Sequence, residues 1–146
     1  IKGTIDPTHV VPLGKARIAR KGTDITIVTY AATVWKALEA AEQLAAEGIS
    51  VEVVDLRSLV PLDEDTMLSS VRKTSRALVV HEDTRTGGFA GEIIARISEH
   101  AFEWLDAPVL RVTAADIPLP YSPPLEDYVL PQVADIVHAV RRTVQY

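Results

Sequence analysis

Three consecutive polar residues, His81, Glu82 and Asp83, have the clearest capacity for chemistry in the sequence. They follow an apolar run and precede a loop that contains glycines. An imidazole beside carboxylates can act as a general acid or base if a partner group and a concave site hold it in place. A polar cluster at the end of a strand can also satisfy backbone groups of the next loop, and we prefer this second interpretation. A perturbed pKa of His81 would favour the first.

The loop after these residues contains Gly87 and Gly88, and Gly91 follows at the start of a predicted helix. Glycines before a helix can place backbone N–H groups close to an anion. A candidate anion-binding loop therefore comprises His81, Glu82, Gly87 and Gly88. The spacing is not G-x-G-x-x-G, so a dinucleotide site is not expected. The simpler interpretation is that Gly87 and Gly88 form the turn and that Gly91 lets the helix pack closely on the sheet.

Other reactive arrangements are missing from the sequence. The chain has no cysteine, which excludes thiolate nucleophiles, cysteine-ligated zinc, iron–sulfur clusters and disulfides, and which fits a reducing compartment. The remaining histidines, His9, His100 and His138, form no H-x-x-x-H or H-E-x-x-H pair, so we expect no metal site. The sequence also lacks a G-x-S-x-G nucleophile elbow.

Composition indicates one soluble globular domain. Of the 146 residues, 47% are hydrophobic and 24% are charged, and the formal net charge is −5. The acidic balance argues against nucleic-acid binding and suits a basic protein partner. No apolar run reaches the roughly 18 residues of a membrane span, and the N-terminus lacks a signal-peptide pattern. We therefore expect the cytoplasm of a bacterium or archaeon rather than the mitochondrial matrix.

Four short apolar runs predict the strands that position these residues, at 25–30, 51–56, 77–81 and 109–112. Three of them are nearly continuous in Val, Ile and Leu, as is typical of strands that are covered on both faces of a parallel sheet. Their starts are 26, 26 and 32 residues apart, which leaves room for a crossover helix each time. The segment 16–20 alternates small or apolar residues with arginine, as expected of an antiparallel edge strand with one wet face.

Helical patterns fill the gaps between these strands. Four helices are predicted, over about 34–45, from the N-cap Asp63 to about Lys73, over about 89–104, and after Pro131. The alternation predicts an α/β fold, with a three-layer, doubly wound, mostly parallel sheet of about five strands and right-handed crossovers.

Two segments fall outside this alternation. Residues 1–10 lack periodicity and are assigned to a linker, so the domain covers residues 11–146. The segment 118–131 contains five of the nine prolines. Because proline fixes φ and removes a donor, we expect an irregular strap there, with Tyr121 and Tyr128 anchoring it against the body.

Four segments together resemble a known family. They are V-P-L-G-K-A-R-I at 11–18, V-E-V-V-D-L-R-S-L-V-P-L-D at 51–63, V-V-H-E-D-x-R-T-G-G-F at 79–89 and Y-S-P-P-L-E-D-Y-V-L-P at 121–131. These segments are similar to the transketolase C-terminal-like domain of the β subunit of 2-oxo acid dehydrogenases of the pyruvate and branched-chain type, the E1 component. The resemblance implies an oxidoreductase of a multienzyme complex. With thiamine diphosphate and Mg²⁺, such an enzyme decarboxylates a 2-oxo acid and acylates a lipoyl group.

The resemblance also limits what these residues can do alone. In the family the cofactor lies between the α subunit and the N-terminal half of β, and these 146 residues do not include that half. The resemblance therefore assigns no catalytic, cofactor-binding or metal-binding residue here, and His81 does not match the family's active-site histidine. We expect the fragment alone to be inactive and to bind no cofactor.

The partners that the resemblance implies are the E1 α subunit and a second β subunit, in an α2β2 assembly, and the subunit-binding domain of the lipoyl acyltransferase, E2. By resemblance, Asp106 and the C-terminal carboxylate of Tyr146 are the candidate residues for docking E2. The rival hypothesis is a standalone α/β domain that binds a small ligand or an anion through the loop 81–91.

Overall fold

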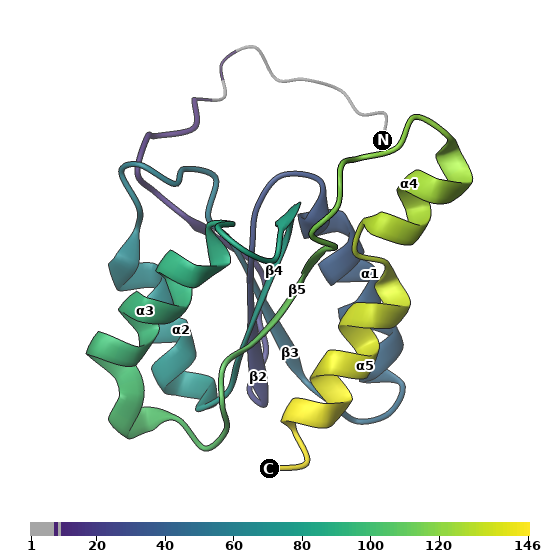
Figure 1. Ribbon diagram of the computed structural model, residues 1–146. Coiled ribbons are helices and arrows are strands. Elements are labelled where there is room, and N and C mark those ends of the chain that lie inside the picture. Colours follow the sequence, from purple (N-terminus) through teal and green to yellow (C-terminus); the bar gives the residue numbers. More distant parts are fainter. Residues whose placement is uncertain (1–7, 9) are drawn as a thin grey trace.

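The computed structural model describes Thr8 and residues 10–146 as an alternation of strands and helices (Figure 1). The strands are β1 (Arg17–Arg20), β2 (Ile25–Thr29), β3 (Val51–Asp55), β4 (Ala77–Thr84) and β5 (Leu110–Ala114). The helices are α1 (Thr33–Ala45), α2 (Glu64–Thr74), α3 (Ala90–Ala101), the 3-10 turn η1 (Phe102–Trp104), α4 (Pro123–Val129) and α5 (Val133–Thr143). Most of the predicted linker, residues 1–7 and 9, lies outside the described residues.

The five strands form one sheet in the order β1-β3-β2-β4-β5. β1 pairs antiparallel with β3, and every other pair is parallel. This arrangement confirms the predicted, mostly parallel sheet with an antiparallel edge strand. The chain moves from β2 to β3 on one side and later continues to β4 and β5 on the other side. The carboxyl ends of β2 and β4 therefore flank the switch point, where open α/β sheets usually bind ligands.

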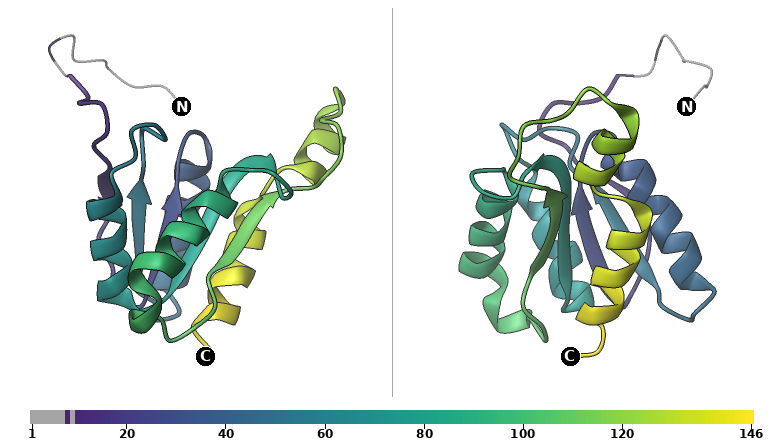
Figure 2. Two further views of the ribbon diagram at one scale, coloured as in Figure 1. Left: turned by 60° about the vertical axis from the view of Figure 1, so that its left-hand side comes forward. Right: turned by 45° about the vertical axis from the view of Figure 1, so that its right-hand side comes forward.

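Two helices cover each face of the sheet (Figure 2). On one face, α1 and α5 pack against a core that includes Ile27 and Val53. On the other face, α2 and α3 pack against a core that includes Val28 and Val54. Because neighbouring residues of a strand point to opposite faces, a strand covered on both faces needs a continuous apolar run. The predicted three layers are therefore confirmed. Within the described part of the chain, no helix is long and apolar enough to cross a membrane.

Asp63 is the N-cap of α2 and also forms a hydrogen bond with the segment before β1. Its carboxylate accepts hydrogen bonds from the Thr66 N–H at 3.3 Å and the Thr66 hydroxyl at 2.9 Å, and from the Ala16 N–H at 2.9 Å. Burial alone would raise the pKa of Asp63, but these hydrogen bonds outweigh it and hold the pKa below its ordinary value. The predicted N-cap is confirmed.

The expectation of an irregular strap over 118–131 is wrong for its second half, which forms α4. Pro123 and Pro124 occupy the first helical turn, where the missing N–H groups would have had no intrahelical partner anyway. The two tyrosines do not anchor the segment, since Tyr121 is fully exposed and Tyr128 is 84% exposed. Proline content alone therefore did not distinguish a helix start from an irregular segment.

Candidate functional site

His81 lies near the carboxyl end of β4, and its side chain is fully buried. The Asp83 N–H points at Nδ1 over 3.1 Å, and the Ala90 N–H, at the start of α3, points at Nε2 over 3.1 Å. A neutral imidazole has one acceptor nitrogen, so each tautomer satisfies one of these two N–H groups, whereas an imidazolium would satisfy neither. This geometry favours a structural role for His81 over acid–base catalysis.

The environment of His81 also disfavours its protonated form. Burial lowers the pKa of His81 below its ordinary value, and the charge of Asp83 offsets part of this effect. The Tyr30 ring stacks on the imidazole with the ring centroids 5.8 Å apart. Burial raises the pKa of Tyr30, and the charges of Asp83 and Glu82 raise it further. The surroundings thus favour the neutral forms of both the His81 and the Tyr30 ring. The carboxylates of Glu82 and Asp83, which follow His81 in β4, are exposed.

The lowered pKa of His81 predicts that the free energy of unfolding decreases below about pH 6.5, where histidine in the unfolded chain binds a proton before folded His81 does. Above that pH the contribution is fully present. For one group the slope does not exceed about 1.4 kcal/mol per pH unit. Urea unfolding of the wild type and of His81→Gln between about pH 7.5 and 5.5 measures the effect. An equal pH dependence in both proteins would contradict the prediction.

The glycines of this loop have different roles from those expected. Gly87 has a positive φ of 77°, as a tight turn requires. A Cβ on Gly88 would lie 2.2 Å from the Thr84 carbonyl oxygen and 2.8 Å from Cε1 of His81, so Gly88 is the position of close approach. A Cβ on Gly91 would meet nothing within 4 Å. The expectation that Gly91 permits close packing on the sheet is therefore wrong.

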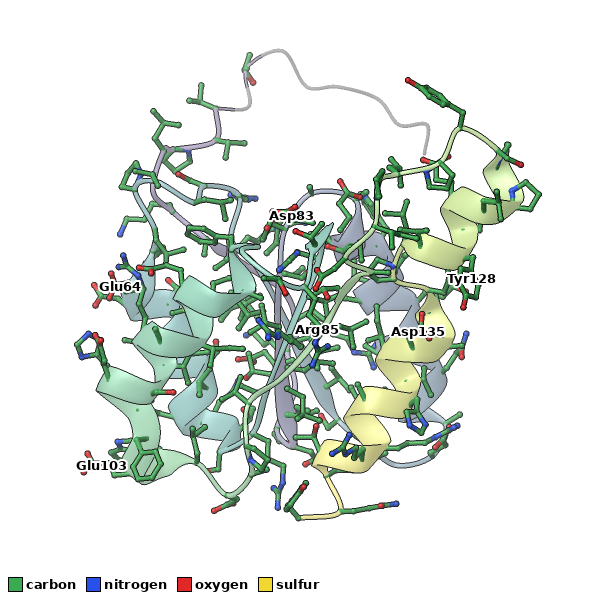
Figure 3. All side chains as sticks on the ribbon, in the orientation of Figure 1. Glu64, Asp83, Arg85, Glu103, Tyr128 and Asp135 are labelled. Atoms are coloured by element: carbon green, nitrogen blue, oxygen red, sulfur yellow. The ribbon has the colours of Figure 1, made fainter. Side chains whose placement is uncertain are left out.

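Two hydrogen bonds between Thr86 and Asp116, here called the clamp, fix the same loop and were not predicted from the sequence. The Asp116 carboxylate, just after β5, accepts hydrogen bonds from the Thr86 N–H at 2.8 Å and from the Thr86 hydroxyl at 2.6 Å. These bonds are the main reason that the pKa of Asp116 lies below its ordinary value. The two residues are 30 positions apart, and only the adjacency of β4 and β5 brings them together. Figure 3 labels Asp83, in β4, and Arg85, in the turn that follows β4.

Asp106, the first docking candidate, lies at the opposite end of the sheet. Its N–H donates to the Ser75 carbonyl at 2.8 Å, just before β4 begins. The side chain is 60% exposed, and one carboxylate oxygen lies 3.8 Å from an Arg76 guanidinium nitrogen. Asp106 also lines a cavity of about 400 Å³ together with Ile94, Ser98, Phe102, Leu105, Ala107, Pro108 and Val109. Phe102 is 75% exposed, so an apolar surface beside an acid faces outward here.

Tyr146, the second docking candidate, is exposed and follows α5. Figures 1 and 2 place the C-terminus and the segment before β5 at the same end of the molecule. No hydrogen bond or ion pair between described residues joins Asp106 to Tyr146. The two docking candidates therefore share one end of the sheet, and the loop with His81, Glu82, Gly87 and Gly88 lies at the other.

One ion pair between a buried carboxylate and a half-exposed lysine was also not predicted from the sequence. Glu52, in β3, is fully buried; its carboxylate accepts hydrogen bonds from Lys73 of α2 and, at 3.3 Å, from the Gly22 N–H. This ion pair could have been predicted, because Glu52 lies inside an apolar run that is expected to be covered on both faces, and a buried carboxylate there needs a charged partner. Among the described residues, no group of three histidine, aspartate or glutamate side chains could hold a metal ion.

The chain matches the family model described as transketolase, C-terminal domain, over residues 14–136. It is 51% identical over 138 residues to the pyruvate dehydrogenase E1 component subunit beta-1, mitochondrial, of Arabidopsis thaliana, which covers 94% of this chain and 38% of that protein. It is 42% identical over 148 aligned residues to the 2-oxoisovalerate dehydrogenase subunit beta of Bacillus subtilis, which covers the whole chain and 45% of that protein.

Among solved structures, a split gene transketolase described as an inactive beta4 tetramer superposes with a TM-score of 0.82 at 28% identity, covering 99% of this chain and 47% of that one. The chain thus spans less than half the length of each of these relatives. The similarities confirm the resemblance inferred from the four sequence segments.

Proposed function

Because the chain belongs to the family of transketolase C-terminal domains, we propose that it is the C-terminal assembly and docking domain of an E1 β subunit. That subunit belongs to a thiamine diphosphate-dependent 2-oxo acid dehydrogenase. The observation that carries the proposal is the 42–51% identity, over nearly the whole chain, to β subunits of two such dehydrogenases. Their names differ in the acid, so the proposal specifies the class of substrate and not one acid. The complete enzyme would decarboxylate that acid and pass the acyl group to a lipoyl group.

The cofactor of the complete enzyme, thiamine diphosphate with Mg²⁺, would be held by residues outside this chain. Supporting this, the described residues offer no cluster of carboxylates or histidines for a metal ion, and the sequence has no phosphate-binding glycine motif. We predict that the chain alone does not bind the cofactor. Calorimetric titration with thiamine diphosphate and Mg²⁺ tests this, and a Kd on the order of 1 μM would contradict it.

The proposed partners are an α subunit and a second β subunit in an α2β2 assembly, and the subunit-binding domain of a lipoyl acyltransferase. We place the enzyme in a bacterial or archaeal cytoplasm, although the relatives include proteins named as mitochondrial as well as proteins from Bacillus subtilis. The net charge of −5 suits a basic partner, because complementary charge speeds association and favours the correct partner.

For the acyltransferase module we propose a docking surface formed by Asp106 and the apolar cavity beside it, with Tyr146 at the same end of the sheet. An exposed carboxylate in the lining of the same cavity as exposed Phe102 offers both a charge for a basic side chain and an anchor site for an apolar one. The ion pair with Arg76 does not saturate this carboxylate, since only one oxygen lies near a guanidinium nitrogen, at 3.8 Å.

We predict that Asp106→Lys weakens binding of the acyltransferase subunit-binding domain by at least about tenfold, because it places like charges together. Glu42→Lys is the matched control. It makes the same charge change at an exposed position of α1. Surface plasmon resonance gives both affinities, and equal loss in the two variants would indicate a general charge effect instead of docking at Asp106.

Deletion of Tyr146 tests the second candidate. Circular dichroism must show that α5 keeps its helicity, since fraying of the last helix would also weaken binding. An unchanged affinity with intact helicity would remove Tyr146 from the proposed surface.

A further inference from the structure

A second cavity, of about 370 Å³, lies on the β5 side of the sheet and shares no lining residue with the cavity beside Asp106. Arg85, Arg111, Tyr128, Leu130 and Asp135 contribute to its lining, which also includes the end of β5 and the connection from α4 to α5. Figure 3 shows Arg85 beside β5, with Tyr128 and Asp135 on the two neighbouring helices. The volume lies within the usual range for small-molecule sites.

The two arginines of this cavity form no ion pair with any residue that the structure describes, although other arginines of the chain do, such as Arg96 and Arg141. Arg111 donates from Nη1 to the Arg85 carbonyl at 3.1 Å, which leaves its other N–H groups available. A guanidinium presents five donors in a planar fork that matches a carboxylate or a phosphate.

The neighbouring carboxylates are occupied by other donors. Asp135 accepts a hydrogen bond from the Gln132 N–H at 2.9 Å as part of the cap of α5. Asp116 is held by Thr86 at 2.6 and 2.8 Å. Both carboxylates therefore reduce the positive potential around the two arginines, but neither forms an ion pair with their guanidinium groups.

The backbone that carries Arg85 is fixed on both sides. The Thr84 hydroxyl donates to the Thr86 carbonyl at 2.9 Å, and Asp116 holds Thr86 from the other side. Arg111 lies in β5, which pairs with β4 in the sheet. Both arginines thus project from positioned backbone, which reduces the entropy lost when a ligand is bound.

We propose that Arg85 and Arg111 form a binding site for a small organic anion that carries a carboxylate or phosphate group. The anionic group would lie between the two guanidinium groups, and the apolar part of the ligand would contact the walls formed by Val112, Ala114 and Leu130. This site is distinct from the proposed docking surface, because the two cavities share no lining residue.

The test uses NMR titration of the ¹⁵N-labelled chain with inorganic phosphate and, separately, with propionate, each against sodium chloride at equal ionic strength. We expect saturable shifts of the amides around Arg85, Arg111 and Leu130, with a Kd on the order of 1 mM for the better probe. Stronger binding of phosphate or of propionate identifies which anionic group the site prefers.

Arg85→Gln is expected to weaken this binding by at least about tenfold while it keeps the backbone carbonyl that Arg111 contacts. Arg142→Gln, at an exposed position near the end of α5, is the matched control and should leave the affinity unchanged. Shifts that do not saturate, that sodium chloride reproduces, or that persist unchanged in Arg85→Gln would overturn the proposal. Failure here would leave the docking proposal untouched, since the docking assay concerns Asp106.

Discussion

Val53→Asp is expected to leave the chain unfolded or aggregated under conditions in which the wild type is folded. Val53 is fully buried in β3, between β1 and β2. An aspartate there would place an unpaired carboxylate in the apolar core under α1 and α5. Leaving such a charge without a partner costs about 3–5 kcal/mol, a large share of the roughly 5–15 kcal/mol by which domains of this kind are stable.

Circular dichroism and thermal unfolding measure the effect of Val53→Asp. Val10→Asp is the control, because it makes the same change at a position that is 81% exposed, and it should shift the stability by no more than about 0.5 kcal/mol. A folded Val53→Asp protein with the wild-type thermal midpoint would mean that β3 is not internal to the sheet.

Gly88→Ala is expected to give the second largest loss of stability. The new Cβ would overlap the Thr84 carbonyl oxygen at 2.2 Å and crowd the His81 ring. Since a backbone atom cannot move aside as a side-chain tip can, the turn itself must shift. Overpacking of this kind costs about 1–3 kcal/mol, and the Ala90 N–H contact to His81 should be disturbed with it.

Gly91→Ala separates this steric effect from a general effect of glycine replacement. It lies in α3, where a Cβ has open space, so helix propensity should stabilise the protein by up to about 1 kcal/mol. Urea unfolding of both variants gives the comparison. If Gly88→Ala proved as stable as Gly91→Ala, the close approach between the turn and His81 would not exist in solution.

The sheet was predictable because its strands need no information beyond the local pattern. A run such as Ile25–Thr29 is buried along its whole length and rich in β-branched residues, which is typical of a strand covered on both faces. The pattern was less informative at element ends. β4 continues through polar residues to Thr84, because pairing with β5 extends it past the apolar run. α4 was missed because two prolines at a helix start look the same, in composition, as prolines in a strap.

The candidate sites also differ in how well the sequence predicts them, according to whether their residues are close together in the chain. The buried histidine and the glycine turn are local in sequence, so His81 and Gly88 could be singled out, although the role of Gly91 was misjudged. The clamp of Thr86 by Asp116 and the proximity of Arg85 to Arg111 depend on β4 lying beside β5. Contacts between residues so far apart in the sequence carry no periodic signal.

The proposed docking function is tested most directly by calorimetric titration of the chain with the subunit-binding domain of its lipoyl acyltransferase, at low and at high salt. We expect saturable binding that weakens as salt increases, because at about 0.1 M salt exposed charges are screened over roughly 10 Å. We also expect Asp106→Lys to remove most of the binding seen at low salt. A titration without saturable binding at any salt concentration, or binding that responds neither to salt nor to Asp106→Lys, would contradict the proposed docking function.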